Sequence, residues 1–351
     1  MSDPGEQAHL NFTSDNEAPA HPKVLAAISE ANEGFATAYA EDIWSKKLDA
    51  AFSARFGIDC RVLPIATGTA ANCVGLGELS PSWGAILCHE SAHIHNDECG
   101  APEFYTGGAK LIPLPGQNGK LEARRVAEYL DSAGAHGIHS TAPAVVAITQ
   151  ATECGTSYRP EEVRALADVA HERGLALHMD GARLANAVAF LECSPAATTW
   201  KAGVDVLSFG ATKNGAVTAE AIVLFGHSER LEGMERRRKR GGHLLSKMRY
   251  VSAQLLAMLD QDLWLELSGH ANRQAARLAE TIEAHPRLAL EWPVEGNEVF
   301  LRASPALLAA LRTQGFEFHI WPGTNDLARL VCSWATDDTA VEALSAALDA
   351  C

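Results

Sequence analysis

The stretch Leu175-Ala176-Leu177-His178-Met179-Asp180-Gly181-Ala182-Arg183 decides the fold class that the sequence predicts. Its first five residues are almost continuously apolar, as in a strand whose sheet is covered by helices on both faces. The strand leads Asp180 into a turn of small residues. A second apolar run, Val204-Asp205-Val206-Leu207, leads into residues 208–215, which contain Lys213. Open α/β sheets bind ligands at such strand ends, so we expect Asp180 and Lys213 to lie close together.

An aspartate and a lysine at two strand ends match the requirements of pyridoxal 5'-phosphate (PLP). The amine of Lys213 would form a Schiff base with the aldehyde, and the carboxylate of Asp180 would pair with the pyridinium nitrogen. Each residue also has an ordinary interpretation, Asp180 as a helix N-cap and Lys213 as a solvated loop residue. Thr67-Gly68-Thr69-Ala70-Ala71-Asn72 follows another strand and opens a helix, where it would bind a phosphate or form a simple turn.

The order of the predicted elements indicates an α/β protein. Short apolar runs alternate with helix-like segments from residue 61 to residue 225, which predicts a mostly parallel sheet. After about residue 228, long helical stretches and shorter strands predict a smaller α+β unit. We therefore expect a flexible tail over residues 1–10, a large cofactor-binding domain over residues 11–255 and a small C-terminal domain over residues 256–351.

Composition excludes several classes of partner. The formal net charge of −15 disfavours nucleic acids and anionic membranes, which would repel the chain. Eight cysteines without a C-x-x-C pair predict free thiols in a reducing cytoplasm rather than a disulfide scaffold. The polar N-terminus predicts no secretion signal, and no apolar stretch approaches the ~20 residues of a membrane span.

Two further motifs require an interpretation. His89-Glu90-Ser91-Ala92-His93 spells the H-E-x-x-H pattern of zinc hydrolases. That chemistry needs both histidines on one face of a helix, whereas this pattern directly follows the strand-like residues 85–88, so zinc hydrolysis is kept only as an alternative and no metal is predicted. The basic run at residues 235–242 is interpreted as a solvated helix face that ends at Gly241-Gly242, with a subunit edge near a neighbour's phosphate as the alternative.

The chain resembles the PLP-dependent L-threonine aldolases of fold type I, the aspartate-aminotransferase-like fold, and in particular the low-specificity and phenylserine-type enzymes of bacteria. The resemblance covers nearly everything from Asn11 to the C-terminus. It implies retro-aldol cleavage of L-threonine, L-allo-threonine and related β-hydroxy-α-amino acids to glycine and an aldehyde. β-Elimination and transamination on the same cofactor remain alternatives. The matching segments are residues 13–16, 67–72, 91–93, 178–183, 212–213 and 327–331.

The resemblance also implies which residues bind the cofactor. His93 would stack on the ring face, Gly68 and Thr69 would bind the phosphate, and Arg249 would reach the phosphate across a subunit boundary. The complete set of cofactor residues that it implies is Gly68, Thr69, His93, Asp180, Arg183, Thr212, Lys213 and Arg249.

For the substrate, the resemblance implies carboxylate binding by arginines, whose planar fork matches a carboxylate. His93, or a water held by His93 and His139, would remove the proton of the β-hydroxyl group. Homo-oligomers are implied as well, as dimers of dimers with active sites at the subunit interface. Gln150-Ala151-Thr152-Glu153 stands where E-N-T-H is frequent, which leaves the substrate range open. The implied substrate residues are Ser14, Tyr39, Arg183 and Arg329, and the implied catalytic residues are His93, His139, Asp180 and Lys213.

Overall fold

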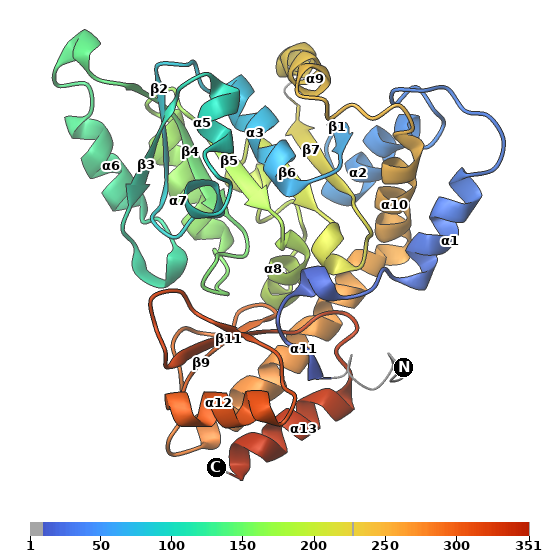
Figure 1. Cartoon of the computed structure of the whole chain (residues 1–351). Coiled ribbons are helices and arrows are strands. Elements are labelled where there is room, and N and C mark those ends of the chain that lie inside the picture. Colours follow the sequence, from blue (N-terminus) through green and yellow to red (C-terminus); the bar gives the residue numbers. More distant parts are fainter. Residues whose placement is uncertain (1–9, 227, 351) are drawn as a thin grey trace.

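The computed structural model describes residues 10–226 and 228–350, and its larger part is built on a sheet covered by helices on both faces (Figure 1). The strands of this sheet are β1 (Cys60–Ile65), β2 (Gly84–His89), β3 (Lys110–Leu114), β4 (Ala142–Thr149), β5 (Ala176–Gly181), β6 (Val206–Gly210) and β7 (Glu220–Phe225). Their order is β1-β7-β6-β5-β4-β2-β3. Among the described strands of this sheet, β7 alone runs opposite to the others: it pairs antiparallel with β1 and β6, and the remaining pairs are parallel. The predicted α/β fold with a mostly parallel sheet is confirmed.

Helices on both faces explain why the strands are continuously apolar. The helices before the second sheet are α1 (Pro22–Ala31), α2 (Leu48–Phe56), α3 (Gly68–Leu79), α4 (His93–Asn96), α5 (Ala101–Thr106), α6 (Ala123–Ser132), α7 (Pro160–His171), α8 (Leu184–Leu191), α9 (Leu231–Arg240), α10 (Arg249–Leu259) and α11 (Leu263–Ala284). Leu87 and Leu177 pack in a core with residues of α2, α7, α8, α10 and α11. Ile86 and Ala176, one residue earlier in the same strands, pack in a core with α3 and α9. Successive residues of a strand point to opposite faces, so both faces need apolar residues.

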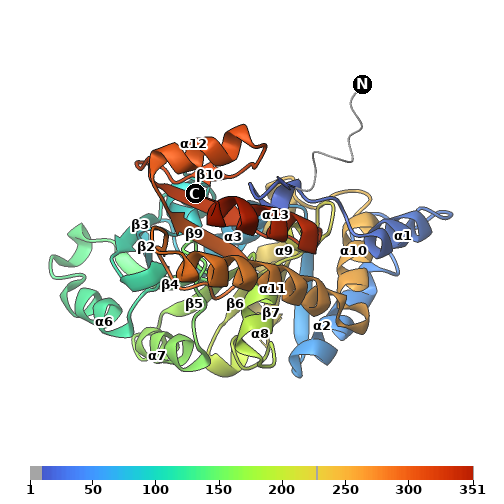
Figure 2. The same cartoon turned by 90° about the horizontal axis from the view of Figure 1, so that it is seen from below.

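A second sheet lies below the first in Figure 1. Its strands are β8 (Ala289–Leu290), β9 (Glu298–Arg302), β10 (His319–Ile320) and β11 (Leu327–Val331), in the antiparallel order β10-β11-β9-β8. Together with α11, α12 (Pro305–Thr313) and α13 (Asp338–Asp349) it has its own apolar core. Figure 2, which views the molecule from below, shows α11 and α13 side by side. Among the described helices, none is long and apolar enough to cross a membrane.

The N-terminal segment joins the second sheet. Phe12 is fully buried in the core of that sheet, and its amide donates to the carbonyl oxygen of Glu317 at 2.8 Å. Its carbonyl oxygen accepts from the amide of Val331 at 2.8 Å. The boundary between the large and the small domain at residues 255 and 256 stays a proposal. Phe12 precedes this boundary in the chain but packs with the small C-terminal domain. The expected tail over residues 1–10 lies outside the described residues except for Leu10.

Two glycines let the ends of β5 and β6 approach closely. A Cβ atom added at Gly210 would lie 2.5 Å from the carbonyl oxygen of Ala182. One added at Gly181 would lie 2.9 Å from the carbonyl oxygen of Ser208. Both distances are too short for any residue with a side chain, so glycine is required where the two backbones meet. The segments that follow these strands are therefore held next to each other.

Replacing Phe209 should destabilise the sheet near this point. Its buried ring lies 5.0 Å from the ring of Phe52 in α2 and 5.4 Å from that of Trp264 in α11. Because Phe209→Ala leaves a cavity between three elements, we expect the free energy of unfolding to fall by about 3–5 kcal/mol in urea denaturation. The control Phe35→Ala removes an exposed ring and should change it by less than ~0.5 kcal/mol. Equal losses in the two variants would contradict the packing role of Phe209.

Candidate active site

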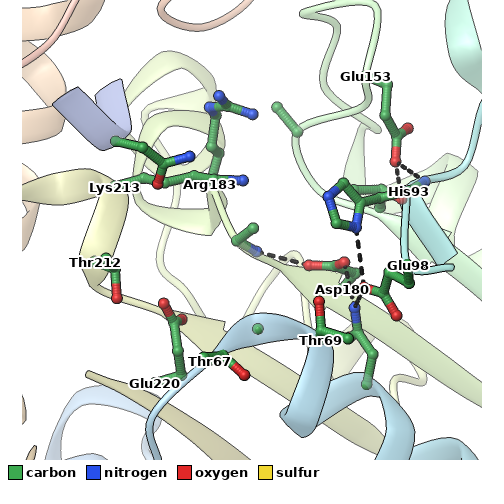
Figure 3. A pocket seen from close by; sticks show the side chains of 16 residues that line it. Thr67, Thr69, His93, Glu98, Glu153, Asp180, Arg183, Thr212, Lys213 and Glu220 are labelled. Carbon is green, nitrogen blue, oxygen red and sulfur yellow. Dashed lines mark hydrogen bonds and ion pairs between the residues drawn. The ribbon is translucent and has the colours of Figure 1, made fainter. Parts of the chain in front are cut away.

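The carboxyl ends of β4, β5 and β6 border a cavity of about 320 Å³, which we call the sheet-edge cavity (Figure 3). A second cavity of about 680 Å³, the inter-sheet cavity, is lined by residues of this edge and of the second sheet. Both volumes suit a small molecule, for which pockets of ~300–1,000 Å³ are usual. The two cavities adjoin, because they share the lining residues Asn16, His93, Glu153, Arg183 and Lys213.

Lys213 and Asp180 reach the sheet-edge cavity from neighbouring strands. Asp180 pairs in register with Ser208 of β6, and Lys213 follows β6 in the 3-10 turn Thr212–Asn214. The carboxylate of Asp180 is buried, and its two oxygens accept hydrogen bonds from Asn72 Nδ2 at 2.7 Å and from the amide of Ala182 at 2.9 Å. The cavity therefore has a primary amine on one side and a fixed, buried carboxylate on the other.

A hydrogen-bonded network connects Asp180 with His93. Asn72 of α3 donates from Nδ2 both to Asp180 Oδ2, at 2.7 Å, and to Glu98 Oε1, at 3.0 Å. The same oxygen of Glu98 lies 2.9 Å from Nδ1 of His93. Both Asn72 and Glu98 are buried. Because the members of the network share hydrogen bonds, the positions of the carboxylate and the imidazole depend on each other.

Two acids hold His93 in place. The hydrogen bond to Glu98 raises the pKa of His93 above its ordinary value, against the opposing effect of burial. A carboxylate at Nδ1 keeps the proton of the neutral ring on that nitrogen, which leaves Nε2 as a proton acceptor. The backbone amide of His93 donates to Glu153 Oε1 at 2.6 Å, and Thr149 donates to the same oxygen at 3.0 Å. Burial raises the pKa of Glu153 to about 7.

His93, Glu98 and Asp180 also form the group of described residues whose ligand atoms are close enough, within 4.8 Å, to hold a metal ion. The amide NH₂ of Asn72, however, points at both carboxylates of this group. A metal ion would need acceptors there, and Nδ2 is a donor. The group is therefore better suited to hydrogen-bond donors than to a cation.

One end of the sheet-edge cavity is suited to an anion. There, the N-cap residue Thr67 accepts a hydrogen bond from the first turn of α3 at 3.2 Å. The first amides of a helix, here those of Gly68 and Thr69, have no intrahelical partners, and the helix dipole favours negative charge near them. A side chain added at Gly68 would meet no atom within 4 Å, so the space beside this backbone is open. Thr212 and Glu220 also line this end (Figure 3).

The inter-sheet cavity contains two arginines. Asp15 accepts hydrogen bonds from Nε and Nη2 of Arg183 at 2.7 and 3.0 Å. Burial by itself would raise the pKa of Asp15, but the positive charge of Arg183 acts in the opposite direction, and on balance this pKa is lowered. The buried Glu298 lies 3.5 Å from Nη1 of Arg183 and 3.8 Å from Nη1 of Arg329. Ser14 lines the same cavity. Two guanidinium groups that face one cavity suit a carboxylate ligand.

The residues of the sheet-edge cavity fit PLP. Lys213 supplies an amine for the aldehyde, and the open backbone at Gly68 leaves space for the phosphate. Asp180 needs a positively charged partner, which a pyridinium nitrogen provides. The buried imidazole of His178, two residues earlier in β5, does not compete, because burial lowers its pKa to about 4 and leaves it neutral. Among the residues that line this cavity, Glu220 opposes PLP binding, because it is an acid at the end suited to the phosphate.

The structure does not bring His139 to either cavity. This residue ends the 3-10 turn Gly137–His139, before the first residue of β4, and so lies at the amino edge of the sheet. The other end of β4, at Thr149, lines the sheet-edge cavity. Eight residues of strand at ~3.3 Å each separate the two edges by roughly 25 Å. Within this protomer His139 lines neither cavity, so its role near the substrate hydroxyl stays a prediction.

Tyr39 and Arg249 also lie outside both cavities. Lys239 Nζ is 4.4 Å from the ring centre of Tyr39, and Arg249 donates from Nη1 to the carbonyl oxygen of Gly34 at 3.1 Å. The resemblance implied that both residues act across a subunit boundary, so their roles stay predictions.

The H-E-x-x-H pattern does not form a zinc site. His89 is the last residue of β2, and α4 begins only at His93, so the two histidines do not share a helical face. Both ring nitrogens of His89 are used locally, since Nε2 lies 3.1 Å from the carbonyl oxygen of Gly116 and Nδ1 accepts from the amide of Ser91 at 3.0 Å. The zinc-hydrolase alternative is therefore wrong.

Sequence analysis assigned no role in the site to three buried acids, Glu98, Glu220 and Glu298, or to the partly buried Glu153. Glu98 follows His93 in a short irregular segment, where no periodic pattern indicates its direction. Glu220 could have been found, because a charged residue that opens an otherwise apolar strand next to the lysine turn is unusual. Glu298 approaches the arginines only through the fold of the second sheet.

Comparison with known proteins agrees with this site. The family model described as beta-eliminating lyase matches residues 11–305. The chain is 44% identical to a low specificity L-threonine aldolase of Pseudomonas aeruginosa, over 95% of both chains. It is 42% identical to a low specificity L-threonine aldolase of another Pseudomonas strain, over 99% of this chain and 98% of the relative.

Solved structures show the same fold. A threonine aldolase structure of Leishmania major superposes with a TM-score of 0.90 at 27% identity and covers 97% of this chain and 98% of that one. A crystal structure of Oryza sativa TDC with PLP, at 14% identity and a TM-score of 0.74, covers 97% of this chain and 82% of that chain. The expected fold type I architecture is confirmed.

Substituting Glu98 should lower the pKa of His93. Glu98→Gln removes the charged acceptor at Nδ1 while burial, which lowers the pKa, remains. Because the pKa of His93 is raised in the folded state, this residue stabilises the fold at pH values below the ordinary histidine pKa. The stabilisation is lost as the pH rises through the folded-state pKa of His93. Imidazole NMR titration should show the lower pKa, and the variant should lose more thermal stability at pH 5.5 than at pH 8.5. An unchanged His93 titration would contradict this role, with the exposed substitution Glu172→Gln as the control.

Proposed function

Since the chain belongs to the beta-eliminating lyase family, and within it to the low specificity L-threonine aldolases, we propose that it cleaves L-threonine and L-allo-threonine to glycine and acetaldehyde with PLP as cofactor. Related β-hydroxy-α-amino acids, including L-phenylserine, belong to the proposed substrate range. In enzymatic terms it is an aldehyde-lyase that breaks a carbon–carbon bond.

The proposal rests on one observation: Lys213, Asp180 and the N-terminus of α3 all line the sheet-edge cavity. These groups suit the aldehyde, the ring nitrogen and the phosphate of one molecule. The adjoining inter-sheet cavity, with its two arginines, is a place for the carboxylate of an amino acid. When bound, PLP supplies an electron sink for the pair of electrons released by bond cleavage at the α-carbon.

Two residues of the chain hold the cofactor in a reactive state. The amine of Lys213 would be the attachment point of the aldehyde. Asp180 would hold a proton on the ring nitrogen, and the hydrogen bonds from Asn72 and Ala182 fix the direction of its carboxylate. A fixed, buried carboxylate acts without the reorganisation that water would need.

Arg183 and Arg329 orient the substrate through its carboxylate, with Ser14 beside them. Asp15 holds one edge of the Arg183 guanidinium, so this arginine has little freedom to move. Orientation would decide which bond of the substrate breaks, and holding the carboxylate is how these residues would set that orientation.

His93 is the group that accepts the proton of the β-hydroxyl. It lines both cavities, and its Nε2 is left free to accept because Glu98 holds Nδ1. As the proton moves to Nε2, the Cα–Cβ bond breaks, the aldehyde leaves and its former bonding pair stays with the α-carbon. Protonation of that carbon then gives glycine. The raised pKa of His93 makes it a better proton acceptor.

We extend the proposal to assembly and location. A homotetramer formed as a dimer of dimers, with Tyr39 and Arg249 directed to neighbouring sites, would complete the phosphate end with a cation. Gel filtration with light scattering tests this assembly. A cytoplasmic location is supported by the thiol state of the seven cysteines in the described part of the chain.

Lys213→Ala tests the central assignment. We expect turnover to fall by roughly three orders of magnitude or more, as when an enzyme loses its covalent nucleophile. The absorption band of lysine-bound cofactor should disappear together with activity. Lys201→Ala, at an exposed lysine outside both cavities, should keep the band and the activity. A fully active Lys213→Ala enzyme would exclude the assignment, and release of a keto acid instead of glycine plus aldehyde by the unmodified enzyme would indicate transamination.

Arg329→Lys tests the substrate carboxylate site. A lysine keeps the charge but loses the planar fork, so a charged hydrogen bond worth ~1.5–3 kcal/mol is weakened. We expect the KM for L-threonine to rise about 10- to 100-fold while the cofactor absorption stays unchanged. Arg312→Lys, on the exposed side of α12, is the matched control. An unchanged KM in Arg329→Lys would remove this residue from the substrate site.

A further inference from the structure

Glu220 lies at the anion-binding end of the sheet-edge cavity. It is the first residue of β7, which runs antiparallel to its neighbours, so it sits at the edge where the other strands end. It pairs with Ile65, the last residue of β1, and with Gly210, the last residue of β6. α3 follows β1 and the lysine turn follows β6, which places Glu220 between them. Figure 3 shows its carboxyl group between Thr67 and Thr212.

An acid at this position conflicts with the proposed ligand of the cavity. The amides at the start of α3 and the hydroxyl of Thr212 favour an anion. Glu220 is buried there, with only 7% of its surface exposed. An ionised carboxylate would repel a phosphate dianion strongly in a buried site. A protonated carboxyl group would instead offer an O–H donor, and phosphate oxygens accept such bonds.

Within this protomer, the charged groups that face Glu220 do not force it to ionise. Among the described residues that line the cavity, these are Lys213 from the lysine turn and Asp180 from β5, which act in opposite directions. The described ends of β1 and α3 add only uncharged residues to the lining. Burial raises the pKa of Glu220 to about 7, although Thr212 and Lys213 lower it. Near neutral pH the acid is thus free to take up a proton when a ligand requires it.

We propose that Glu220 binds the cofactor phosphate as a neutral carboxylic acid, donating its O–H to a phosphate oxygen beside the N-terminus of α3 and the hydroxyl of Thr212. The inference rests on PLP binding as proposed above. It has a measurable consequence, because binding must then take up one proton wherever the free enzyme has lost it. The affinity for PLP should fall with increasing pH above about pH 7, by up to tenfold for each pH unit.

The experiment compares PLP dissociation constants of the apo forms of the unmodified enzyme and of Glu220→Gln from pH 6 to pH 9. Glutamine keeps a neutral N–H donor of the same size and cannot ionise. The ionisation of PLP itself affects both proteins equally. The dissociation constant of the unmodified enzyme divided by that of Glu220→Gln therefore isolates the effect of Glu220. We expect this ratio to be nearly constant below pH 7 and to rise about tenfold per pH unit above it. With pyridoxal, which lacks the phosphate, the ratio should stay constant across the range.

A constant ratio for PLP would overturn the inference, since Glu220 would then stay ionised beside the phosphate, with Arg249 from a neighbouring subunit, as proposed above, supplying the balancing charge. Glu161→Gln, at an exposed position of α7, should behave as the unmodified enzyme. If neither PLP nor pyridoxal gave the absorption of lysine-bound cofactor, the proposed function itself would fail, which is a different result from a constant ratio.

A second measurement needs no variant. At pH 8, infrared difference spectra of the unmodified enzyme should gain the carbonyl band of a protonated carboxylic acid when PLP is added. The band should shift in protein labelled with ¹³C-glutamate, and pyridoxal should not produce it. Absence of the band with PLP bound would exclude a neutral Glu220 whether or not Glu220→Gln folds.

Discussion

The close contact between the ends of β5 and β6 determines the rest of the site. At Gly210 the backbone of one strand meets that of Ala182 at a distance that only glycine allows. Because of this contact, the turn after β5 and the lysine turn after β6 open from nearly the same point of the sheet. The carboxylate of Asp180 and the amine of Lys213 can therefore face one small molecule, although they lie 33 positions apart in the chain.

The same edge of the sheet concentrates acids that are buried, and each must be paired or neutral. Asp15 is paired with Arg183, and Glu98 accepts hydrogen bonds from Asn72 and His93. Glu153 and Glu220 have pKa values raised to about 7 by burial, so they do not carry a full charge near neutral pH. Asp180 remains as the buried carboxylate with space for a cationic partner. A pyridinium nitrogen fits this requirement better than a metal ion, because the donor Nδ2 of Asn72 already lies between Asp180 and Glu98.

The sequence predicted what depends on local pattern. Continuous apolar strands indicated a covered sheet, and the residues that end them, Asp180 and Lys213, indicated the cavity, because strand ends of a parallel sheet meet at one edge. The sequence did not predict contacts that depend on how distant segments approach each other. Glu98 reaches His93 through an irregular turn. The antiparallel direction of β7, which brings Glu220 to the edge of the sheet, cannot be deduced from the composition of that strand. His139 was assigned by resemblance alone, and its place before β4 puts it at the opposite edge.

His93 is the residue through which the geometry favours carbon–carbon cleavage over other reactions of the same cofactor. Removal of a proton from the α-carbon, the first step of elimination or transamination, needs a base at that carbon, whereas aldol cleavage needs a base at the β-hydroxyl. Glu98 fixes the ring of His93 and Glu153 fixes its backbone, so Nε2 has little freedom to move. In the proposed mechanism the arginines of the inter-sheet cavity would fix the substrate from the other side. The reaction would then depend on which substrate atom lies at Nε2, and the β-hydroxyl group is the one that the proposal assigns to His93.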